Sequence, residues 1–304
     1  QKPRLTLRER DRAFFENYVQ GIRLHELIAQ DAAQLDNESQ RNIRINDKLF
    51  LDKLEEKFGN DSDGLTKFGG FLVQRCFLVA VSTPSQQSAF RVFSVLNSRG
   101  LDLLPTDIIK SDIIGNIKSP EEQDEVTERW EELEVQTGRD GFAELFGHIR
   151  MIFSKEKARR TLLEEFREQV IKKYESPETL MSTVVEPFAD AYLTAKKCQY
   201  LSTTNAADVN ALLKWLNRIE NSDWLPSAIK FLATQGKDAD YVLWFFRKLE
   251  RLASFMHICG YDVNQRIERY ATVLSALEGS HSLEAPISAV DLGPEEKSEM
   301  LQVL

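Results

Sequence analysis

Apolar side chains recur at steps of three and four residues over most of the chain, which is the spacing of one face of an α-helix. The longest stripe comprises Val242, Phe245, Phe246, Leu249, Ala253 and Met256. We interpret it as the core-facing side of a helix. Shorter stripes in "AADVNALLKWLNRI" and "DWLPSAIKFLAT" predict further helices. No repeat period links these segments, so an antiparallel helical array is expected and not a regular solenoid.

Two of the predicted helices carry a start signal. Ser119 precedes Pro120 and stands three residues before Glu122, which predicts an N-cap followed by a proline at the first helical position. The same Ser-Pro-Glu order begins at Ser176, and Pro187 within that segment should kink or restart its helix.

The first third of the chain has a mixed pattern. Residues 39–58 have mostly helical spacing, whereas Leu5 and Leu7 alternate with polar residues, and the run from Cys76 to Val81 is β-rich and ends before Pro84. The sequence therefore predicts a mainly α fold, a multi-helix antiparallel array, with a small β element near the N-terminus.

Composition limits the class of protein. The 304 residues are 42% hydrophobic and 29% charged, as in a soluble globular protein, and no run of roughly 18 uncharged apolar residues predicts a membrane-spanning helix. The N-terminus lacks an apolar signal core. Cys76, Cys198 and Cys259 lack metal-ligand spacing, so we expect three buried thiols in a reducing cytoplasm. A first residue other than Met and a helix-like pattern at the end indicate a piece of a longer chain.

Charge and motifs exclude several functions for the segment itself. A net charge of −9 disfavours attraction of DNA by the whole surface, although local basic patches remain open. There is no phosphate-binding glycine loop, dinucleotide fingerprint, His-Glu-x-x-His or serine elbow. We therefore predict neither catalytic residues nor metal ligands here.

One basic segment, "RMIFSKEKARR", has two interpretations. It could contact DNA or form a solvated helix end, and the acidic chain favours the solvated end. The candidate DNA contacts are Arg150, Lys155, Lys157, Arg159 and Arg160.

Residues 90–114, "FRVFSVLNSRGLDLLPTDIIKSDII", predict a helical corner. A helix over about 86–98 should end near Gly100, which suits a left-handed C-cap, and Pro105 suits the first position of the next helix. Asp107 can accept backbone N–H groups there, and Ile109 begins the buried stripe.

The polar residues of this corner allow two interpretations. Asn97 and Arg99 could tie the corner together, with Arg99 paired to Asp102 or Asp107. Alternatively, Arg99 and Lys110 could offer cations to a phosphate beside a helix N-terminus. The physical argument slightly favours the structural tie.

The corner resembles the signature segment of the domain of unknown function 262 family, which includes the first half of GmrSD-type, modification-dependent restriction endonucleases. The matching positions are Ala89, Phe93, Leu96, Asn97, Arg99, Gly100, Leu103, Asp107 and Lys110. Ile108 and Ile109 replace leucines, and Leu104 stands where a capping Ser is common. Looser similarity in "RLTLRERDRAFF" and "DVNQRIERYATVLSAL" extends the resemblance over most of the chain.

The resemblance implies an NTP-hydrolysing portion with an Asp-Gly-Gln-Gln-Arg motif and Mg²⁺, followed in many members by a His-Asn-His-type nuclease half. Neither motif occurs here. Residues 1–118 would be the C-terminal part of the nucleotide-associated domain, and 119–304 a helical domain before the nuclease. The nucleotide-associated residues would be Asn97, Arg99, Gly100, Asp107 and Lys110.

The expected function is therefore that of the helical middle of an NTP-dependent DNA endonuclease of prokaryotic defence, cytoplasmic and inert by itself. Its partners would be the missing nucleotide motif, the missing nuclease half and, through the full-length protein, DNA. The alternative is a non-enzymatic helical adaptor that binds proteins through apolar and acidic faces. Self-association is left open.

Overall fold

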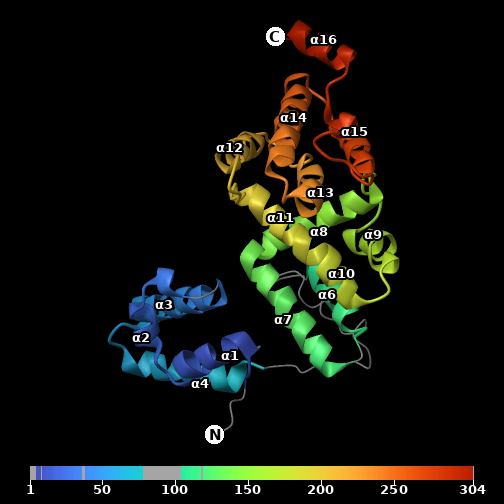
Figure 1. Ribbon diagram of the computed structural model, residues 1–304. Coiled ribbons are helices and arrows are strands. Elements are labelled where there is room, and N and C mark those ends of the chain that lie inside the picture. Colours follow the sequence, from blue (N-terminus) through green and yellow to red (C-terminus); the bar gives the residue numbers. More distant parts are fainter. Residues whose placement is uncertain (1–4, 8, 36–37, 78–103, 118, 304) are drawn as a thin grey trace. The chain divides into compact units, whose positions relative to one another are not determined.

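A computed structural model describes residues 5–7, 9–35, 38–77, 104–117 and 119–303 (Figure 1). These residues are mainly helical, which confirms the predicted α class. The chain divides into two compact units, Gln1–Pro84 and Ser85–Leu304. The family resemblance predicts a domain boundary after residue 118, which is not the boundary between these two units. That domain boundary stays a prediction.

Unit 1 consists of helices joined by short turns. It contains α1 (Glu9–Phe15), a π-helical turn (Glu16–Gln20), α2 (Leu24–Ala29), a 3₁₀ turn (Ala32–Gln34), α3 (Glu38–Phe58) and α4 (Ser62–Arg75). Helix α3 confirms the helix predicted over 39–58, and Gly59 ends it with a φ of +47°. The Asp61 carboxylate then begins α4 by accepting a hydrogen bond from the Gly64 N–H at 2.9 Å.

The interior of unit 1 is small and partly polar. Leu27 and Leu35 are buried there together with the polar side chains of Asp11, Gln40 and Asp47. Several large apolar side chains are instead exposed on its last two helices. They are Ile45, Leu49 and Phe50 on α3 and Leu65, Phe71, Leu72 and Val73 on α4. Unit 1 therefore exposes apolar area that a larger core would bury.

The predicted small β element is not supported. Leu5 and Leu7 lie in a segment without regular structure, and Cys76 and Phe77 follow the end of α4 without forming a strand. Residues 78–81 of the predicted strand lie outside the described residues. A single short strand gains stability only beside a partner strand, and the described part of the chain offers none.

Unit 2 contains the remaining described helices and the main core. They are α6 (Pro105–Ile114), α7 (Pro120–Thr137), α8 (Arg139–Ser154), α9 (Leu162–Gln169), α10 (Pro177–Leu180), α11 (Glu186–Lys197), α12 (Ala206–Leu216), α13 (Leu225–Gln235), α14 (Ala239–Ile258), α15 (Val263–Ala276) and α16 (Pro294–Val303). Helix α11 packs against α13, and α12 packs against α14. Shorter turns complete the unit at Ile171–Lys173, Met181–Val185 and Ser288–Val290.

Aromatic rings build much of this core. Trp130 of α7 lies 5.2 Å from Phe142 and 5.1 Å from Phe146 of α8, measured between ring centroids. Phe231 of α13 stacks on Phe245 of α14 at 3.7 Å. All six positions of the stripe predicted between Val242 and Met256 are buried, so that prediction is confirmed.

The local signals of helix start are also confirmed. The Ser119 hydroxyl accepts from the Glu122 N–H, and the Ser176 hydroxyl accepts from the Thr179 N–H. Before Pro187 the chain makes a π-helical turn, Met181–Val185, and α11 begins after it. Proline supplies no N–H to the helical ladder, so a change of hydrogen-bond register next to it is expected.

Two expectations from composition have different outcomes. Among the described helices, none combines the length and the hydropathy needed to cross a bilayer. The expectation of three buried thiols is wrong, because Cys76 is exposed and Cys198 and Cys259 are half-buried. Cys76 follows the final turn of α4 in unit 1, where little core is available to cover it.

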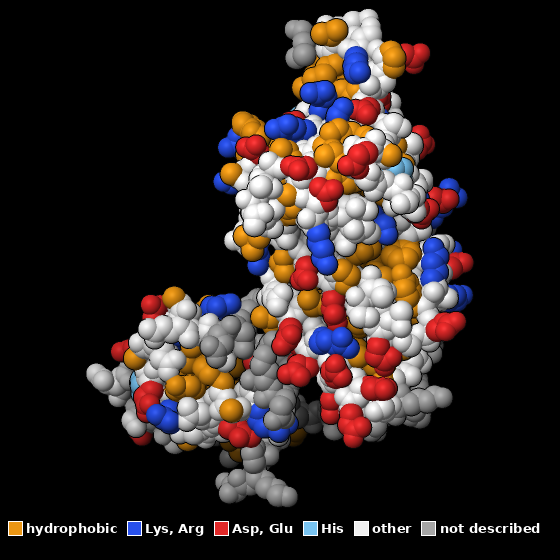
Figure 2. Space-filling view, in the orientation of Figure 1, with side chains coloured by type: hydrophobic (Ala, Val, Ile, Leu, Met, Phe, Trp, Pro, Cys, Tyr) orange, Lys and Arg blue, Asp and Glu red, His pale blue; other side chains and the backbone are white. Residues whose placement is uncertain are grey.

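In Figure 2 acidic side chains gather over the part of unit 2 that contains α7.

Candidate functional site

Two of the five predicted nucleotide-associated residues, Asp107 and Lys110, lie on α6. Asn97, Arg99 and Gly100 lie outside the described residues. Helix α6 begins at Pro105, as the proline signal predicts. The geometry of α6 therefore shows how the second half of the corner is held.

Asp107 caps the start of its own helix. Leu104 occupies the N-cap position and has no side-chain oxygen to cap with. Instead, the Leu104 N–H donates to the Asp107 carboxylate at 2.9 Å, which is the reciprocal half of a capping box. The Arg139 guanidinium lies 3.7 Å from the same carboxylate. Asp107 thus stabilises the positive end of α6.

Charged pairs fix the other faces of α6 to its neighbours. The Lys110 Nζ lies 3.0 Å from a Glu131 carboxylate oxygen on α7, and both side chains are largely buried. Arg167 of α9 donates two hydrogen bonds to Asp112, at 2.5 and 2.9 Å. These bonds raise the pKa of Arg167 above its ordinary value.

Apolar packing adds to these pairs. Ile109 is fully buried and Ile113 is nearly so. Helix α6 contacts α7, α8 and α9. It is therefore a fixed support on unit 2, and its Lys110 ammonium is engaged with Glu131 in this arrangement. A role of Asp107 and Lys110 beside a nucleotide stays a prediction.

A buried carboxylate organises the predicted basic segment. Glu165 of α9 is 7% exposed and accepts hydrogen bonds from the backbone N–H groups of Arg159 and Arg160, at 2.7 and 2.8 Å. The Arg150 guanidinium lies 3.1 Å from its second oxygen. Burial alone would raise the pKa of Glu165, but these donors outweigh burial and lower it.

The other cations of this segment also have partners. Lys155 pairs with Glu278, Arg160 with Glu168, and Lys157 donates to the Asn264 amide oxygen at 2.9 Å. The segment borders a hollow of about 180 Å³, in which Glu165 already provides a negative charge. The segment therefore has a clear structural role, and contact with DNA stays a prediction.

A polar cluster between α8 and α11 was not predicted from the sequence. Glu144 accepts from the Tyr192 hydroxyl at 2.7 Å and lies 3.3 Å from the His148 Nε2 and 3.2 Å from the Lys196 Nζ. The contact with His148, together with the Tyr192 bond and Lys196, lowers the pKa of Glu144 to about 2. Glu144 and His148 are four residues apart, which signals one helix face, but Tyr192 is too distant in sequence to be linked to them.

The described residues contain no group of three or more His, Cys, Asp or Glu side chains that could hold a metal ion. Asp107, the acidic member of the predicted corner, is occupied with the start of α6. Nucleotide and Mg²⁺ therefore stay predictions for the full-length protein.

Comparison with known proteins supports the resemblance over part of the chain. Residues 1–114 match the family model described as the N-terminal domain of the GmrSD restriction endonuclease. Searches of curated proteins and of solved structures give no match. Membership of the domain of unknown function 262 family stays a prediction. The matched segment ends at Ile114, the last residue of α6. The chain thus resembles the GmrSD restriction endonucleases over residues 1–114.

Proposed function

We propose that this chain is the helical middle of a GmrSD-like, NTP-dependent DNA endonuclease that restricts foreign or modified DNA in prokaryotic defence. The observation that carries the proposal is the match of residues 1–114 to the N-terminal domain of these endonucleases. That segment includes the Asn97–Arg99–Gly100 corner and the whole of α6.

The position of α6 supports a linking role. By the family match it belongs to the N-terminal domain, but by packing it belongs to unit 2. Lys110 joins it to α7 and Asp112 joins it to α9. A change at the corner would therefore pass to α7 and α9 through a single stiff helix, because packed helices move as units. In this proposal α6 carries the nucleotide state towards the nuclease half.

The nucleotide, the Mg²⁺ and the nuclease belong to the full-length protein in this proposal, which acts in the cytoplasm. Arg99 would stabilise phosphate charge and Asn97 would orient the loop. This chain should neither hydrolyse nucleotide nor cleave DNA by itself, because its sequence has neither the Asp-Gly-Gln-Gln-Arg motif nor a metal-binding nuclease motif.

The test compares Arg99→Ala with Arg75→Ala in the full-length protein. Arg75 is an exposed arginine in the last turn of α4 and serves as the matched control. We expect Arg99→Ala to weaken nucleotide binding at least about tenfold, as loss of a charge-assisted phosphate contact does, while thermal unfolding stays unchanged. Arg75→Ala should affect neither quantity.

The opposite result would support the structural interpretation of the corner. If Arg99→Ala lowers the unfolding temperature and leaves nucleotide affinity intact, Arg99 is a structural tie. If the full-length wild-type protein neither binds nor hydrolyses any nucleoside triphosphate, the endonuclease proposal is wrong.

The apolar surface of unit 1 favours a second candidate, a non-enzymatic adaptor that binds proteins. Phe50 of α3 is 67% exposed and Val73 of α4 is 84% exposed. Exposed apolar patches of this kind are typical of protein-binding surfaces. For an adaptor, Phe50→Asp should abolish partner binding, and nucleotide should have no effect on that binding.

A further inference from the structure

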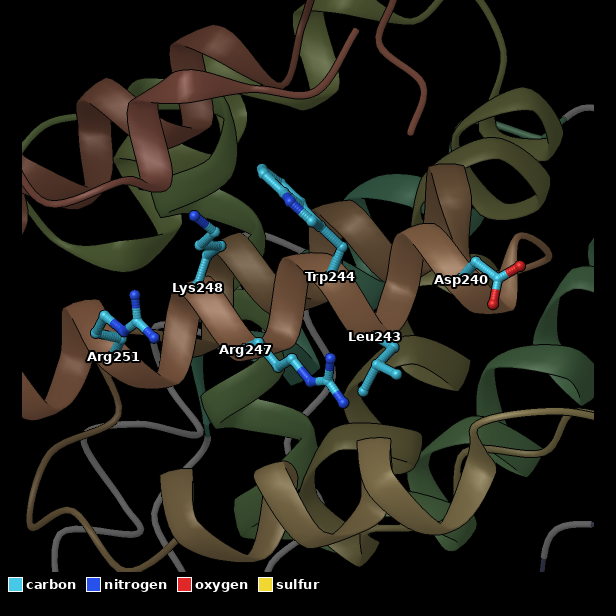
Figure 3. A pocket seen from close by; sticks show the side chains of 6 residues that line it. All are labelled: Asp240, Leu243, Trp244, Arg247, Lys248 and Arg251. Atoms are coloured by element: carbon cyan, nitrogen blue, oxygen red, sulfur yellow. The ribbon is translucent and has the colours of Figure 1, made fainter. Parts of the chain in front are cut away.

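The side of α14 that faces away from its buried stripe carries a half-buried indole ring and three cations. They follow one another at steps of three, one and three residues, so they lie on the face opposite the buried stripe. We call this set the α14 cationic face; it consists of Trp244, Arg247, Lys248 and Arg251. Figure 3 shows these side chains projecting from one helix, where they border a hollow of about 320 Å³ together with Asp240 and Leu243.

The two arginines of this face are weakly engaged. Arg247 lies 3.9 Å from Asp208 of α12, and both side chains are more than 60% exposed, at 62% and 65%. Such an exposed pair is screened by solvent and is easily exchanged for another anion. Arg251 forms no ion pair with any residue that the structure describes. Both guanidinium groups are therefore available to pair with an anionic group of another molecule.

Lys248 and Trp244 form the other part of the face. The Lys248 Nζ lies 2.5 Å from an Asp291 carboxylate oxygen and 5.5 Å from the centre of the Trp244 ring. The ammonium is thus held in place beside the indole. Trp244 itself is half-buried and packs against the core, so it forms an apolar support beside the cations.

This arrangement differs from that of the basic segment between Arg150 and Arg160. There the buried Glu165 and the carboxylates of Glu168 and Glu278 lie against the cations. On α14, Lys248 also has a close carboxylate partner, Asp291, but Arg247 has only an exposed partner at 3.9 Å, and Arg251 has none among the described residues. The net charge of −9 of the chain does not prevent local attraction, because charges farther away than about 10 Å are screened at physiological salt.

We propose that the α14 cationic face binds the phosphate backbone of DNA. Arg247 and Arg251 are one helical turn apart, about 6 Å along the axis. Each guanidinium can donate two N–H hydrogen bonds to a phosphate. Lys248 is paired with Asp291, so the two arginines supply the charge that is offered to phosphates. Contacts with phosphates carry no base sequence, so this surface holds and orients DNA without selecting a site. The choice of DNA among polyanions rests on the proposed function.

Fluorescence anisotropy tests the inference, with the full-length protein and a labelled DNA duplex of about 30 base pairs. Salt is varied between about 50 and 200 mM, because phosphate contacts give a steep salt dependence. The reversal R247E/R251E should weaken binding at least tenfold and flatten the slope of log affinity against log salt by about 2. The variant R247Q/R251Q should show a smaller loss than the reversal, and R247K/R251K a smaller loss still, since it keeps the charge but not the paired N–H donors.

A matched control separates this face from a general charge effect. K172E/K173E makes the same change of charge at two exposed lysines of the turn Ile171–Lys173. It should leave affinity within about twofold of the wild type. Equal weakening by K172E/K173E and R247E/R251E would overturn the inference. So would wild-type affinity in R247E/R251E, or the absence of DNA binding by the wild-type protein.

Nucleotide hydrolysis without DNA, measured on the same preparations, distinguishes this inference from the proposed function. R247E/R251E should hydrolyse nucleotide at the wild-type rate while its DNA binding is lost. If the wild type hydrolyses no nucleotide but binds DNA through α14, the proposed function fails and the α14 inference stands. If hydrolysis is present and R247E/R251E binds DNA normally, the α14 inference alone fails.

Discussion

At the scale of single residues, a few carboxylates hold helices that lie far apart in the sequence. Glu144 joins α8 to α11 through Tyr192 and Lys196, and Glu165 joins the end of α8 to α9 through Arg150. Both carboxylates are more than half covered by other groups and accept several donors. A carboxylate with several donors is more stable ionised, so its loss or protonation should weaken the fold.

The stability of unit 2 should depend on the ionisation of Glu144. The pKa of this carboxyl falls from an ordinary 4.5 to about 2 on folding, chiefly through His148. Its contribution is therefore complete above pH 4.5 and is lost as the pH falls towards 2. Glu144→Gln should lower the free energy of unfolding by about 1–2 kcal/mol at pH 7, allowing for partial solvent screening.

Urea unfolding at several pH values between 7 and 3 measures this effect. The difference in the free energy of unfolding between the wild type and Glu144→Gln should shrink below pH 4.5, where the wild-type carboxylate begins to take up a proton. Glu132→Gln, at an exposed position of α7, is the control and should show no such convergence. A constant difference at all pH values would show that Glu144 acts by packing alone.

At the scale of elements, the segment 155–161 is held by an acceptor that comes from the next helix. Glu165 occupies the backbone N–H groups of Arg159 and Arg160, so the segment bends around a buried negative charge. Glu165→Ala should destabilise unit 2 by about 2–4 kcal/mol, because Arg150 and two N–H groups lose their partner. Glu165→Gln should be intermediate.

Limited digestion with trypsin reports on this segment directly, since it contains Lys155, Lys157, Arg159 and Arg160. Trypsin cleavage within this segment should be faster in Glu165→Ala, because a segment that opens more often fits more easily into the active site of the protease. Glu168→Ala removes the exposed partner of Arg160 and serves as the control. Unchanged cleavage in Glu165→Ala would contradict the role given to Glu165.

Elements with local signals could be predicted from the sequence, and elements that depend on distant partners could not. The capped starts at Ser119 and Ser176 and the buried stripe of α14 follow from neighbouring residues alone. The prediction of a small β element was wrong. A β-rich run shows only that a strand is favourable and not that a partner strand exists beside it. Helix α4, with Gly69 and Gly70 inside it, carried no helix prediction.

The candidate sites show the same limit. Asp107 was expected to accept backbone N–H groups at the start of α6, and it does so. Glu131 and Glu165 lie on other helices than the cations that they bind, and no spacing rule links them. The cations of the α14 face could have been found, because Arg247, Lys248 and Arg251 fill the gaps of the apolar stripe. Their environment could not be predicted, since Asp208 and Asp291 come from other elements.

At the scale of the whole molecule, the two units have different interiors. The main hydrophobic cluster runs from Ile109 to Leu292 and lies wholly in unit 2. Unit 1 buries few apolar side chains and leaves several exposed. Burial of apolar area is the main stabilising term in folding, so unit 2 should fold by itself.

This difference makes the position of the domain boundary testable with two shortened chains. One begins at Leu104 and keeps α6, and the other begins at Ser119, where the family resemblance places the boundary. Loss of α6 exposes the core beneath Ile109 and Ile113 and removes the partners of Glu131 and Arg167. The chain 119–304 should therefore be less stable than 104–304 by about 4–6 kcal/mol, which lowers the unfolding temperature by on the order of 10 °C. Circular dichroism during heating measures both chains. Equal unfolding temperatures would show that α6 does not stabilise the core of unit 2. The proposed linking role of α6 would then lose its physical basis. A helix that contributes nothing to the fold of unit 2 cannot transmit its own movement to α7 and α9.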